Sequence, residues 1–360
     1  MIDPSVIAAP GPVAPPRRLG TIERIPKWLN LVPMVVQWCW LGLRHRSLTL
    51  PSAANPRITA GGLVGDGKAE YFAGMGSWAR RFVAGFVMLR GGDTTATALA
   101  ALARADLTFP IVAKPDLGWC GFGVRRLDGV ADLEAYLRRF PVGEALMLQR
   151  YLDEPGEAGL FYLRPPDQPH GHLLGVLLRH YPRVTGDGCR TMAQLVAADA
   201  RLRRTTCDRL HECRYRADRV PAAGETVRLS LIGSTRVGGR YEDGSALATP
   251  RLVATIDAIA RDMPQFHAGR FDVRYRSLGE LRRGRFTIIE VNGAGSEAVH
   301  AWDPAYSLRQ TYRMVFAKQR QLFAIGAAMR ARGHAPIGAL ALARLHLRQQ
   351  RLIRRYPPSN

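Results

Sequence analysis

The sequence predicts an α+β (α/β) protein, because segments with strand character alternate with glycine-rich turns and with helices of period 3.6. Phe109 to Ala113 has the composition of a short strand and leads into a glycine-rich turn. Val130 to Phe140 follows with helical spacing, since Leu133 and Leu137 are four residues apart. Phe271 to Tyr275 and Phe286 to Val291 have strand character on either side of a turn-like segment. We therefore expect a strand, turn and helix unit followed by a long antiparallel hairpin.

The composition is that of a packed globular protein with a strong excess of positive charge. The chain has 360 residues, 47% of them hydrophobic, and a formal net charge of +21. Such a charge attracts acidic partners, namely nucleotides, nucleic acid or an anionic membrane surface, and does not choose among them. Lysine occurs only at positions 27, 68, 114 and 318, so arginine carries nearly all of the positive charge. Five cysteines without a Cys-x-x-Cys pair indicate free thiols in a reducing compartment, and we expect a cytoplasmic location.

The N-terminal part differs in composition from the rest. Residues 1–27 are rich in Pro and Ala and lack the pattern of a secretion signal, which predicts a disordered tail. The apolar stretch from Trp28 to Leu43 is too short to span a bilayer and is interrupted by Pro33 and Gln37. It favours a buried or interfacial helix over a peripheral membrane contact assisted by the basic residues at 44–46.

The remaining elements follow from the same patterns. Strand character continues at Ala145 to Tyr151, Gly159 to Leu163 and His172 to His180, and a helix is expected from Thr249 to Arg261. From Pro304 onward the pattern is helical with a break near Gly333, and it ends in a basic amphipathic helix that includes Arg344 to Arg355.

Two glycine-rich segments could approach phosphate groups. Gly62 to Ala69 fits Gly-x-x-x-x-Gly-Lys but ends in Ala, where a phosphate-binding loop needs Ser or Thr, so we interpret it as a flexible glycine loop. The second segment is IVAKPDLGWCGFGV, residues 111–124. There Lys114 ends an apolar strand, and the glycines after it leave room for backbone N–H groups to approach the same anion. By itself this pattern is weak.

A polar pair of strand segments predicts a metal site. In RFDVR, Arg270 and Asp272 are two residues apart, and in IIEVNGAGSE the same spacing separates Glu290 and Asn292. Residues two apart on a strand share a face, so a paired hairpin would bring these oxygens together. Oxygen ligands of this kind suit magnesium, which one or two carboxylates commonly hold together with nucleotide phosphates.

Taken together, the Lys-Pro with its glycine loop, the strand-end hinge, the Arg-x-Asp and the Glu-x-Asn resemble the ATP-grasp superfamily. The similarity is to carboxylate-amine ligases related to D-alanine-D-alanine ligase and covers roughly residues 95 to 305. Residues 183–195, RVTGDGCRTMAQL, also resemble a turn in cyanophycin synthetase-like proteins. The resemblance implies an ATP-grasp fold of two α+β subdomains that grip a nucleotide, with a short N-terminal region and C-terminal helices.

The domain boundaries expected from this resemblance divide the chain into four parts. The disordered tail covers 1–27, and 28–94 form an N-terminal region with an apolar helix and loops, which would correspond to a truncated pre-ATP-grasp domain. The ATP-grasp domain covers 95–305, with a small lid subdomain at 95–155 and a metal-binding subdomain at 156–305. Basic helices occupy 306–360.

The resemblance also implies a role for each matching residue. Lys114 would contact nucleotide phosphates, and Arg270 would steady the acyl-phosphate. The remaining implied residues are Gly118, Gly121 and Gly123 as the lid over the phosphates; Gln149, Arg150, Tyr151 and Leu152 as the hinge that reads adenine; Glu157 on the ribose; and Asp272, Glu290 and Asn292 on magnesium, or on manganese in its place.

Three features depart from the family pattern. The hinge lacks the usual leading acid, since Gln149 or Arg150 stands there. Only about ninety residues precede the match, where relatives carry a substrate-binding domain. The second phosphate-binding lysine is also missing from its expected place, and Arg90 or Arg104 is a possible substitute.

The predicted function is an ATP- and magnesium-dependent ligase that activates a substrate carboxylate as an acyl-phosphate for attack by an amine or a similar nucleophile. Glu297 and His300 lie just after the metal motif and could touch the substrate. Two alternatives stay open: an ATP-grasp scaffold without catalysis, and a basic protein that docks on a membrane surface or on nucleic acid. No zinc finger or aromatic-interleaved basic motif supports specific nucleic-acid recognition. The sequence leaves the oligomeric state open.

Overall fold

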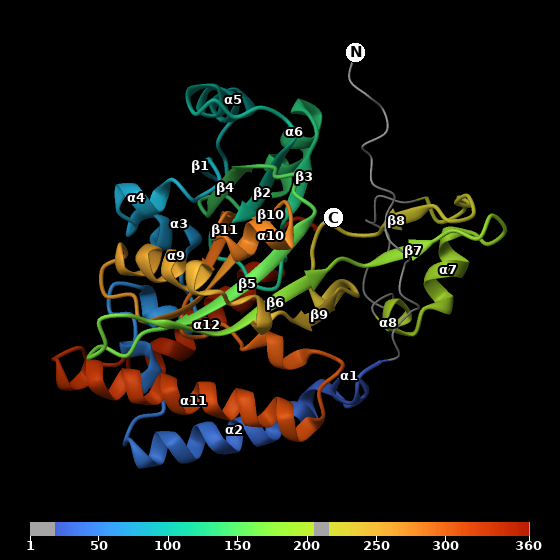
Figure 1. Ribbon diagram of the computed structural model, residues 1–360. Helices are drawn as coiled ribbons and strands as arrows, with labels where there is room; N and C mark the ends of the chain where they lie inside the picture. Colours follow the sequence, from blue (N-terminus) through green and yellow to red (C-terminus); the bar gives the residue numbers. More distant parts are fainter. Residues whose placement is uncertain (1–18, 205–215, 360) are drawn as a thin grey trace.

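The computed structural model describes residues 19–204 and 216–359 and consists of two α+β units, each built on an antiparallel sheet, with helices beneath them (Figure 1). The predicted fold class, α+β with two subdomains, is confirmed. The two units meet where the chain passes from strand β4 to strand β5, and this junction positions the candidate site.

The smaller unit, which we call the lid unit, has a four-stranded sheet in the order β1-β4-β2-β3. Its strands are β1 (Phe86–Arg90), β2 (Ile111–Pro115), β3 (Arg125–Leu127) and β4 (Ala145–Arg150), and its helices are α5 (Thr95–Arg104) and α6 (Val130–Arg139). The edge strand β1 lies before residue 95, so the sheet takes in more of the chain than the lid segment expected from the sequence.

Helix α12 (Ala339–Ile353) completes the core of the lid unit. Leu352 and Tyr356, at and just beyond the end of this helix, pack with Leu133 and Leu137 of α6 and with Ile111 of β2. The C-terminal basic segment is therefore a packed part of the lid unit.

The larger unit has a five-stranded sheet in the order β11-β10-β5-β6-β9. Its strands are β5 (Gly156–Leu163), β6 (His172–His180), β9 (Arg240–Asp243), β10 (Ala268–Tyr275) and β11 (Thr287–Asn292). One face packs on α9 (Pro250–Arg261) and α3 (Lys68–Ala73), through Ile256, Ile259 and Phe72. The other face packs on α11 (Leu308–Ala331), through Leu322 and Met329.

The predicted hairpin is present, with a helix in its turn. Strands β10 and β11 pair antiparallel, with Asp272 opposite Glu290 and Arg270 opposite Asn292. The connecting segment contains the short helix α10 (Leu278–Arg282), whose N-cap Ser277 accepts a hydrogen bond from the backbone of Glu280. A β-bulge follows Asp272 in this pairing, and it matters for the site described below.

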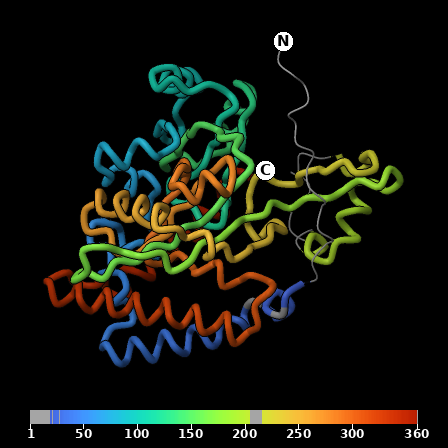
Figure 2. Tube along the Cα trace, viewed as in Figure 1, coloured from blue at the N-terminus to red at the C-terminus, as the bar shows by residue number. Residues whose placement is uncertain are grey.

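The other elements lie outside the two large sheets. A small unit projects to one side (Figure 1) and contains β7 (Arg183–Thr185), β8 (Thr226–Arg228), α7 (Met192–Ala198) and α8 (Ala200–Arg203). Helix α4 (Ser77–Arg80) follows α3 and precedes β1. Helix α2 (Lys27–Arg44) runs along α11 on the side away from the large sheet, so the layers from sheet to base are sheet, α11 and α2 (Figure 2).

Part of the segment at 1–27, expected to be a disordered tail, is helical in the structure. Residues 1–18 lie outside the described part of the chain, but Thr21–Arg24 form helix α1. Ile22 is buried, and its carbonyl accepts a hydrogen bond from the side chain of Asn30. A salt bridge of 2.7 Å between Glu23 and Arg201 of α8 also anchors α1.

Candidate functional site

Lys114 of the lid unit forms a hydrogen bond with the large sheet. It lies within β2 and is 5% exposed. Its Nζ donates to Gln149 Oε1 on the neighbouring strand β4 and to the carbonyl oxygen of Ile289 on β11, both at 2.7 Å. Burial lowers the pKa of Lys114 to about 8, although the nearby carboxylate of Glu290 opposes the shift.

The β-bulge explains why this carbonyl is available. In the ladder Asp272 pairs with Glu290 and the next residue, Val273, pairs with Ile288, so Ile289 has no partner residue on β10. A bulged residue is released from regular pairing, and here its carbonyl accepts from the lysine of the other unit.

Lys68 is the second buried lysine of the site. It begins α3, is 7% exposed, and donates from Nζ to the backbone oxygen of Asp116 at 3.2 Å. Its Nζ also lies 3.5 Å from Glu290 Oε1. The structure therefore places Lys68, from the segment interpreted as a flexible loop, next to the acid of the metal motif. Arg90 and Arg104, the substitutes considered above, are both exposed.

The glycine loop after β2 closes over Lys68. A Cβ at position 118 would lie only 2.7 Å from Lys68 Nζ, so Gly118 leaves the space that this ammonium group needs. Gly121 and Gly123 have φ values of +75° and +74°, in the left-handed region that favours glycine. The loop that was expected to cover the phosphates thus lies against a buried cation.

Other segments hold the same loop in place. Gln349 Nε2, on α12, donates to the carbonyl of Gly118 at 3.2 Å, and the hydroxyl of Tyr356 donates to the carbonyl of Leu117 at 2.7 Å. Arg236 donates to the carbonyl of Cys120 at 3.0 Å and lies over the ring of Phe122. The C-terminal segment is therefore part of the site's support.

The metal motif forms a buried ionic network centred on Asp272. Arg270 donates to both of its oxygens, from Nε at 2.7 Å and from Nη2 at 3.0 Å. Arg179 of β6 and the amide of Asn292 each donate to Oδ2 at 3.1 Å. Burial opposes ionisation of Asp272, but Arg179 and Arg270 outweigh it, so the pKa of Asp272 is lowered.

This network bears on the expected magnesium ligands. The four residues Arg270, Asp272, Glu290 and Asn292 do meet at one place, as the strand spacing predicts. Both oxygens of Asp272 already accept from guanidinium groups, an arrangement that suits orienting two arginines more than binding a divalent cation. Glu290 has a half-buried carboxylate whose one ion pair is the long contact to Lys68, and Asn292 turns its amide nitrogen toward Asp272. Of the three expected ligands, Glu290 and Asn292 fit a metal better than Asp272 does.

Glu157 also has different partners from those expected. It lies inside β5, opposite Arg274 of β10, and is not in the hinge itself. Arg179 donates to its Oε1 at 2.9 Å, while the hydroxyl of Tyr181 donates to Oε2 and Arg274 lies 3.5 Å from that oxygen. This carboxylate is fully engaged by side chains of the same sheet, whereas a ribose-binding acid would need open oxygens.

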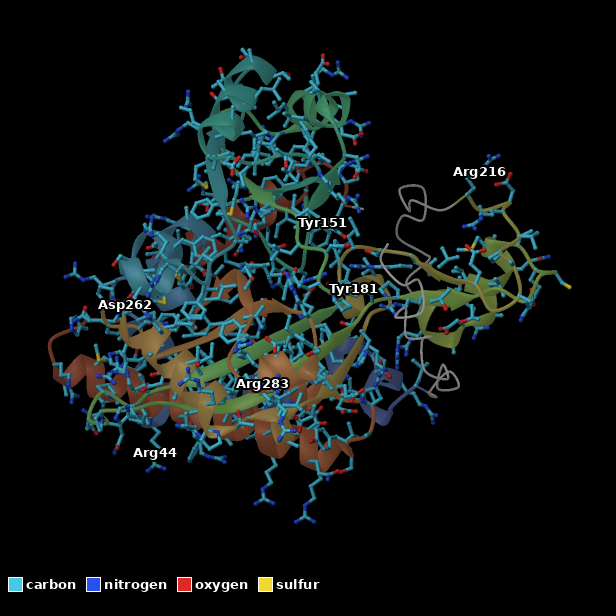
Figure 3. All side chains as sticks on the ribbon, turned by 45° about the horizontal axis from the view of Figure 1, so that its top comes forward. Arg44, Tyr151, Tyr181, Arg216, Asp262 and Arg283 are labelled. Carbon is cyan, nitrogen blue, oxygen red and sulfur yellow. The ribbon has the colours of Figure 1, made fainter. Side chains whose placement is uncertain are left out.

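The predicted hinge connects the two units, and its residues have separate contacts. Gln149 is buried against Lys114, whereas Arg150 is exposed and reaches the carbonyl of Asp106. Arg126 lies over the ring of Tyr151, which Figure 3 labels between the lid unit and the large sheet. The carbonyl of Leu152 accepts from Arg274 at 3.2 Å.

A third buried lysine, Lys318, approaches the segment after the metal motif from α11. Its Nζ donates to the carbonyl of Ser296 and lies 5.3 Å from the ring centroid of Phe161. Burial lowers the pKa of Lys318 to about 8, with nearby Glu297 opposing the shift. His300, considered above as a substrate contact, is buried against the backbone of Gly175. Burial lowers the pKa of His300, which suits a packed neutral imidazole.

Sequence reasoning missed Lys68, Arg179 and Lys318 as members of the site. Arg179 looked like one of many arginines, and its strand offers no motif. The one available signal was the rarity of lysine, since three of the four lysines in the chain are buried here.

No protein-family profile and no curated protein sequence matches this chain. Among solved structures it is similar to a bifunctional glutathione synthetase from Pasteurella multocida, with 19% identity and a TM-score of 0.37, over 70% of this chain and 35% of that one. It is also similar to VanG D-Ala:D-Ser ligase from Enterococcus faecalis, with 14% identity and a TM-score of 0.41, over 73% and 62% of the two chains. For D-alanine–D-alanine ligase from Bacillus anthracis the identity is 12% and the TM-score 0.37, over 71% and 70%.

The chain thus spans about a third of the synthetase and 62% of VanG. These proteins are ATP-grasp ligases, the kind that the sequence motifs resemble. Because every TM-score is below 0.5, we take the function from the contacts within this chain alone.

Proposed function

We propose that the protein is an ATP- and magnesium-dependent ligase that activates a substrate carboxylate as an acyl-phosphate and joins it to an amine or a similar nucleophile. The observation that carries this proposal is the convergence of Lys114 and Lys68, two buried ammonium groups from separate segments, beside Glu290 and under a glycine loop. Burying two ammonium groups beside a single carboxylate costs free energy unless a further anion binds between them. A polyphosphate is an anion that can do so.

The phosphate groups would lie between the two lysines and the loop. Lys114 and Lys68 would each donate to phosphate oxygens, while Gly118, Gly121 and Gly123 leave the backbone free to approach them. The adenosine would lie along the hinge, with the backbone of Gln149 to Leu152 available to read the base. Given its contacts, we assign Glu157 to holding Arg179 and Arg274 in place.

Magnesium would be held by Glu290 and Asn292 together with the phosphates, and when bound it neutralises charge that the lysines alone cannot. Asp272 would join this set only by giving up some of its contacts with Arg179 and Asn292. In the structure as it stands, Asp272 fixes the direction of the Arg270 guanidinium.

The chemistry asks the chain mainly to position groups and to neutralise charge. A carboxylate oxygen of the substrate would attack the γ-phosphate and ADP would leave; an amine would then attack the acyl carbon, phosphate would leave, and the amine would lose a proton. Arg270, held rigidly by Asp272, is placed to stabilise the negative charge on the transferred group. Lys318 offers a further cation on the side of Ser296, where the carboxylate of a substrate could bind.

The proposal is tested by calorimetric titration of Mg·ATP into the wild-type protein and into Lys114→Met and Lys68→Met, at low and moderate salt. We expect saturable binding that withstands moderate salt and is weakened at least about tenfold by either substitution, since a charge-assisted hydrogen bond contributes roughly 1.5–3 kcal/mol. Weak, salt-sensitive binding that ignores both lysines would contradict the proposal.

Phosphate release then separates a ligase from a scaffold. Wild-type protein with Mg·ATP is screened against pools of carboxylic acids and amines, with Arg270→Met as the matched variant. Phosphate release that requires both substrates and Arg270 supports the ligase. Tight ATP binding without phosphate release for any pair of substrates favours the non-catalytic scaffold. The observation in favour of the scaffold is that both carboxylate oxygens of Asp272 already accept hydrogen bonds from Arg270.

A further inference from the structure

Helix α2 turns an apolar face outward, away from the rest of the molecule. Eight large apolar side chains of this helix are exposed, and two of them, Leu43 and Trp28, are 77% and 69% exposed. We call this set the α2 face; it consists of Trp28, Leu29, Leu31, Val32, Val35, Val36, Trp40 and Leu43. Spacings of three and four residues keep it continuous along the helix, which runs unbroken through Pro33.

The side of α2 that faces the protein has polar contacts beside the apolar packing of Trp38 and Leu41 on Phe323. Asn30 is buried and donates to the carbonyl of Ile22, while its own carbonyl accepts from the hydroxyl of Tyr312 on α11. Gln37 donates to the carbonyl of Phe316 at 2.9 Å, and Gln319 of α11 donates to the carbonyl of Met34 at 3.1 Å. A helix on the surface of a water-soluble protein normally does the opposite and turns its apolar side chains inward. These hydrogen bonds and the packing of Trp38 and Leu41 together fix the orientation of α2. Within the described part of the chain, its exposed apolar residues are left available to a partner.

The helix that carries the α2 face and the helix packed on it are basic. Neither α2 nor α11 contains a single Asp or Glu. Arg44 and Arg46 are exposed at the C-terminal end of α2, and Figure 3 labels Arg44 at this outer edge. On the adjacent α11 the exposed arginines are Arg309, Arg313, Arg320 and Arg330.

Two kinds of occupant fit this chemistry poorly. A second copy of this chain would bring the same basic rim and a net charge of +21 toward an identical charge. Nucleic acid would satisfy the arginines but would leave the tryptophans and valines against a polar backbone. An apolar layer bordered by anions matches both features, and a lipid bilayer with anionic headgroups has that structure.

We propose that the α2 face docks this protein on the surface of an anionic lipid bilayer, with the helix lying in the plane of the interface. No helix among the described residues is long and apolar enough to span a membrane, so the contact is with one leaflet. The eighteen residues of α2 would extend about 27 Å along that surface. Trp28 and Trp40 would insert near its two ends, and the arginines beside them would meet headgroup phosphates.

In this docked orientation, the helix layer that supports the candidate site would lie next to the membrane. Helix α11 packs on α2 with one side and carries Lys318 toward Ser296 with the other (Figures 1 and 2). The proposal does not depend on the ligase activity, because the α2 face shares no residue with the site.

Vesicle flotation of the full-length protein tests the proposal directly. The probes are vesicles of phosphatidylcholine alone and vesicles with about a third phosphatidylglycerol. We expect the wild-type protein to float with the anionic vesicles, and a smaller fraction of it to float at high salt. With neutral vesicles it should remain in the bottom fraction. The variant Val36→Ser/Leu43→Ser should lower the partition coefficient at least about tenfold, because two large apolar side chains would no longer enter the apolar layer.

Matched control variants distinguish binding through the α2 face from non-specific binding to vesicles. The variant Val142→Ser/Leu278→Ser removes two apolar side chains that are 81% and 46% exposed elsewhere, and it should float like the wild type. Replacing Arg44 and Arg313 with Gln should remove most of the salt dependence. Brominated lipids should quench tryptophan fluorescence in the wild type and much less in Trp28→Phe/Trp40→Phe.

Three results would overturn the proposal. The wild-type protein could fail to float with anionic vesicles, or the Val36→Ser/Leu43→Ser variant could float as well as the wild type while keeping its thermal stability. The wild type could also be a dimer that this variant converts to a monomer without any change in flotation, in which case the α2 face belongs to a second copy of the chain.

Discussion

The variant Asp272→Asn should have a lower free energy of unfolding than the wild type and a lower activity. The carboxylate accepts three hydrogen bonds from Arg270 and Arg179, whose side chains are only 11% and 14% exposed. An amide at this position has one acceptor oxygen and turns its NH2 group toward a guanidinium group. The two buried cations would then lack most of their negative partner.

The size of the effect follows from this burial. Removing one partner of a buried ion pair typically costs 3–5 kcal/mol, because the other charge is left uncompensated. Arg179 keeps its 2.9 Å contact with Glu157, so we expect the lower end, about 3 kcal/mol. The matched control is Glu290→Gln, because Glu290 is 31% exposed and its one ion pair measures 3.5 Å. This contact is longer than those of Asp272 and Glu290 is partly exposed, so we expect Glu290→Gln to lose less stability than Asp272→Asn.

Denaturant unfolding followed by circular dichroism compares Asp272→Asn, Glu290→Gln and the wild type, with Mg·ATP turnover measured on the same samples. We expect both variants to lose turnover and only Asp272→Asn to lose about 3 kcal/mol of stability. If Asp272→Asn is as stable as Glu290→Gln, Asp272 does not hold the two arginines together, and a direct role in metal binding becomes the better explanation.

Three further predictions concern the lysines and the loop. Lys68→Met should weaken Mg·ATP binding at least about tenfold in calorimetry. The control Arg104→Met, a substitution on the exposed side of α5, should leave the affinity unchanged. Equal losses of affinity in the two variants would show that binding depends on net charge alone. Because burial lowers the pKa of Lys114 to about 8 and phosphates favour its charged form, nucleotide affinity should fall as pH rises through about 8. Calorimetry in buffers of different ionisation enthalpy should detect proton uptake near pH 8.5, which Lys114→Met should reduce; unchanged uptake would assign the proton to another group. Tyr356→Phe removes the hydrogen bond to Leu117 and should speed chymotrypsin cleavage at Phe122, and an unchanged cleavage rate would mean that the C-terminal segment does not restrain the loop.

Lys114 should also affect stability in the free protein. Its folded pKa of about 8 lies below the unfolded lysine value of roughly 10.4, so between these values the unfolded chain binds more protons. The free energy of unfolding should therefore rise with pH across this window, and the rise should be smaller in Lys114→Met, as thermal unfolding at several pH values can show.

The role of the C-terminal basic segment is one result that the sequence alone did not indicate. A basic amphipathic helix at the end of a chain is usually a solvated face. In the structure Leu352 and Tyr356 pack into the lid unit, and Gln349 binds the glycine loop. Deleting the segment would therefore disturb the lid unit and the candidate site.

The local patterns of the sequence determined a large part of the fold. Helix α6, expected at Val130 to Phe140, ends one residue earlier, and β6 has the expected bounds of His172 to His180. The two-residue period of strands also placed Arg270 and Asp272 on one side of β10, and Glu290 and Asn292 on one side of β11. The pairing of the two strands puts all four on the same face of the sheet. Spacing along one strand or helix is a short-range property, and backbone geometry fixes it without reference to the rest of the chain.

Only the tertiary structure decided which distant side chains complete the site and where the apolar side of α2 points. Lys68 and Lys318 lie 46 residues before and 204 residues after Lys114, and no periodicity connects such positions. The pattern of α2 likewise defines an apolar side without giving its direction. The contacts of Asn30, Gln37 and Leu41 with neighbouring segments hold the opposite side of the helix against the protein and so turn the apolar side outward. A buried polar group must find a partner, and that requirement is met by segments far apart in sequence.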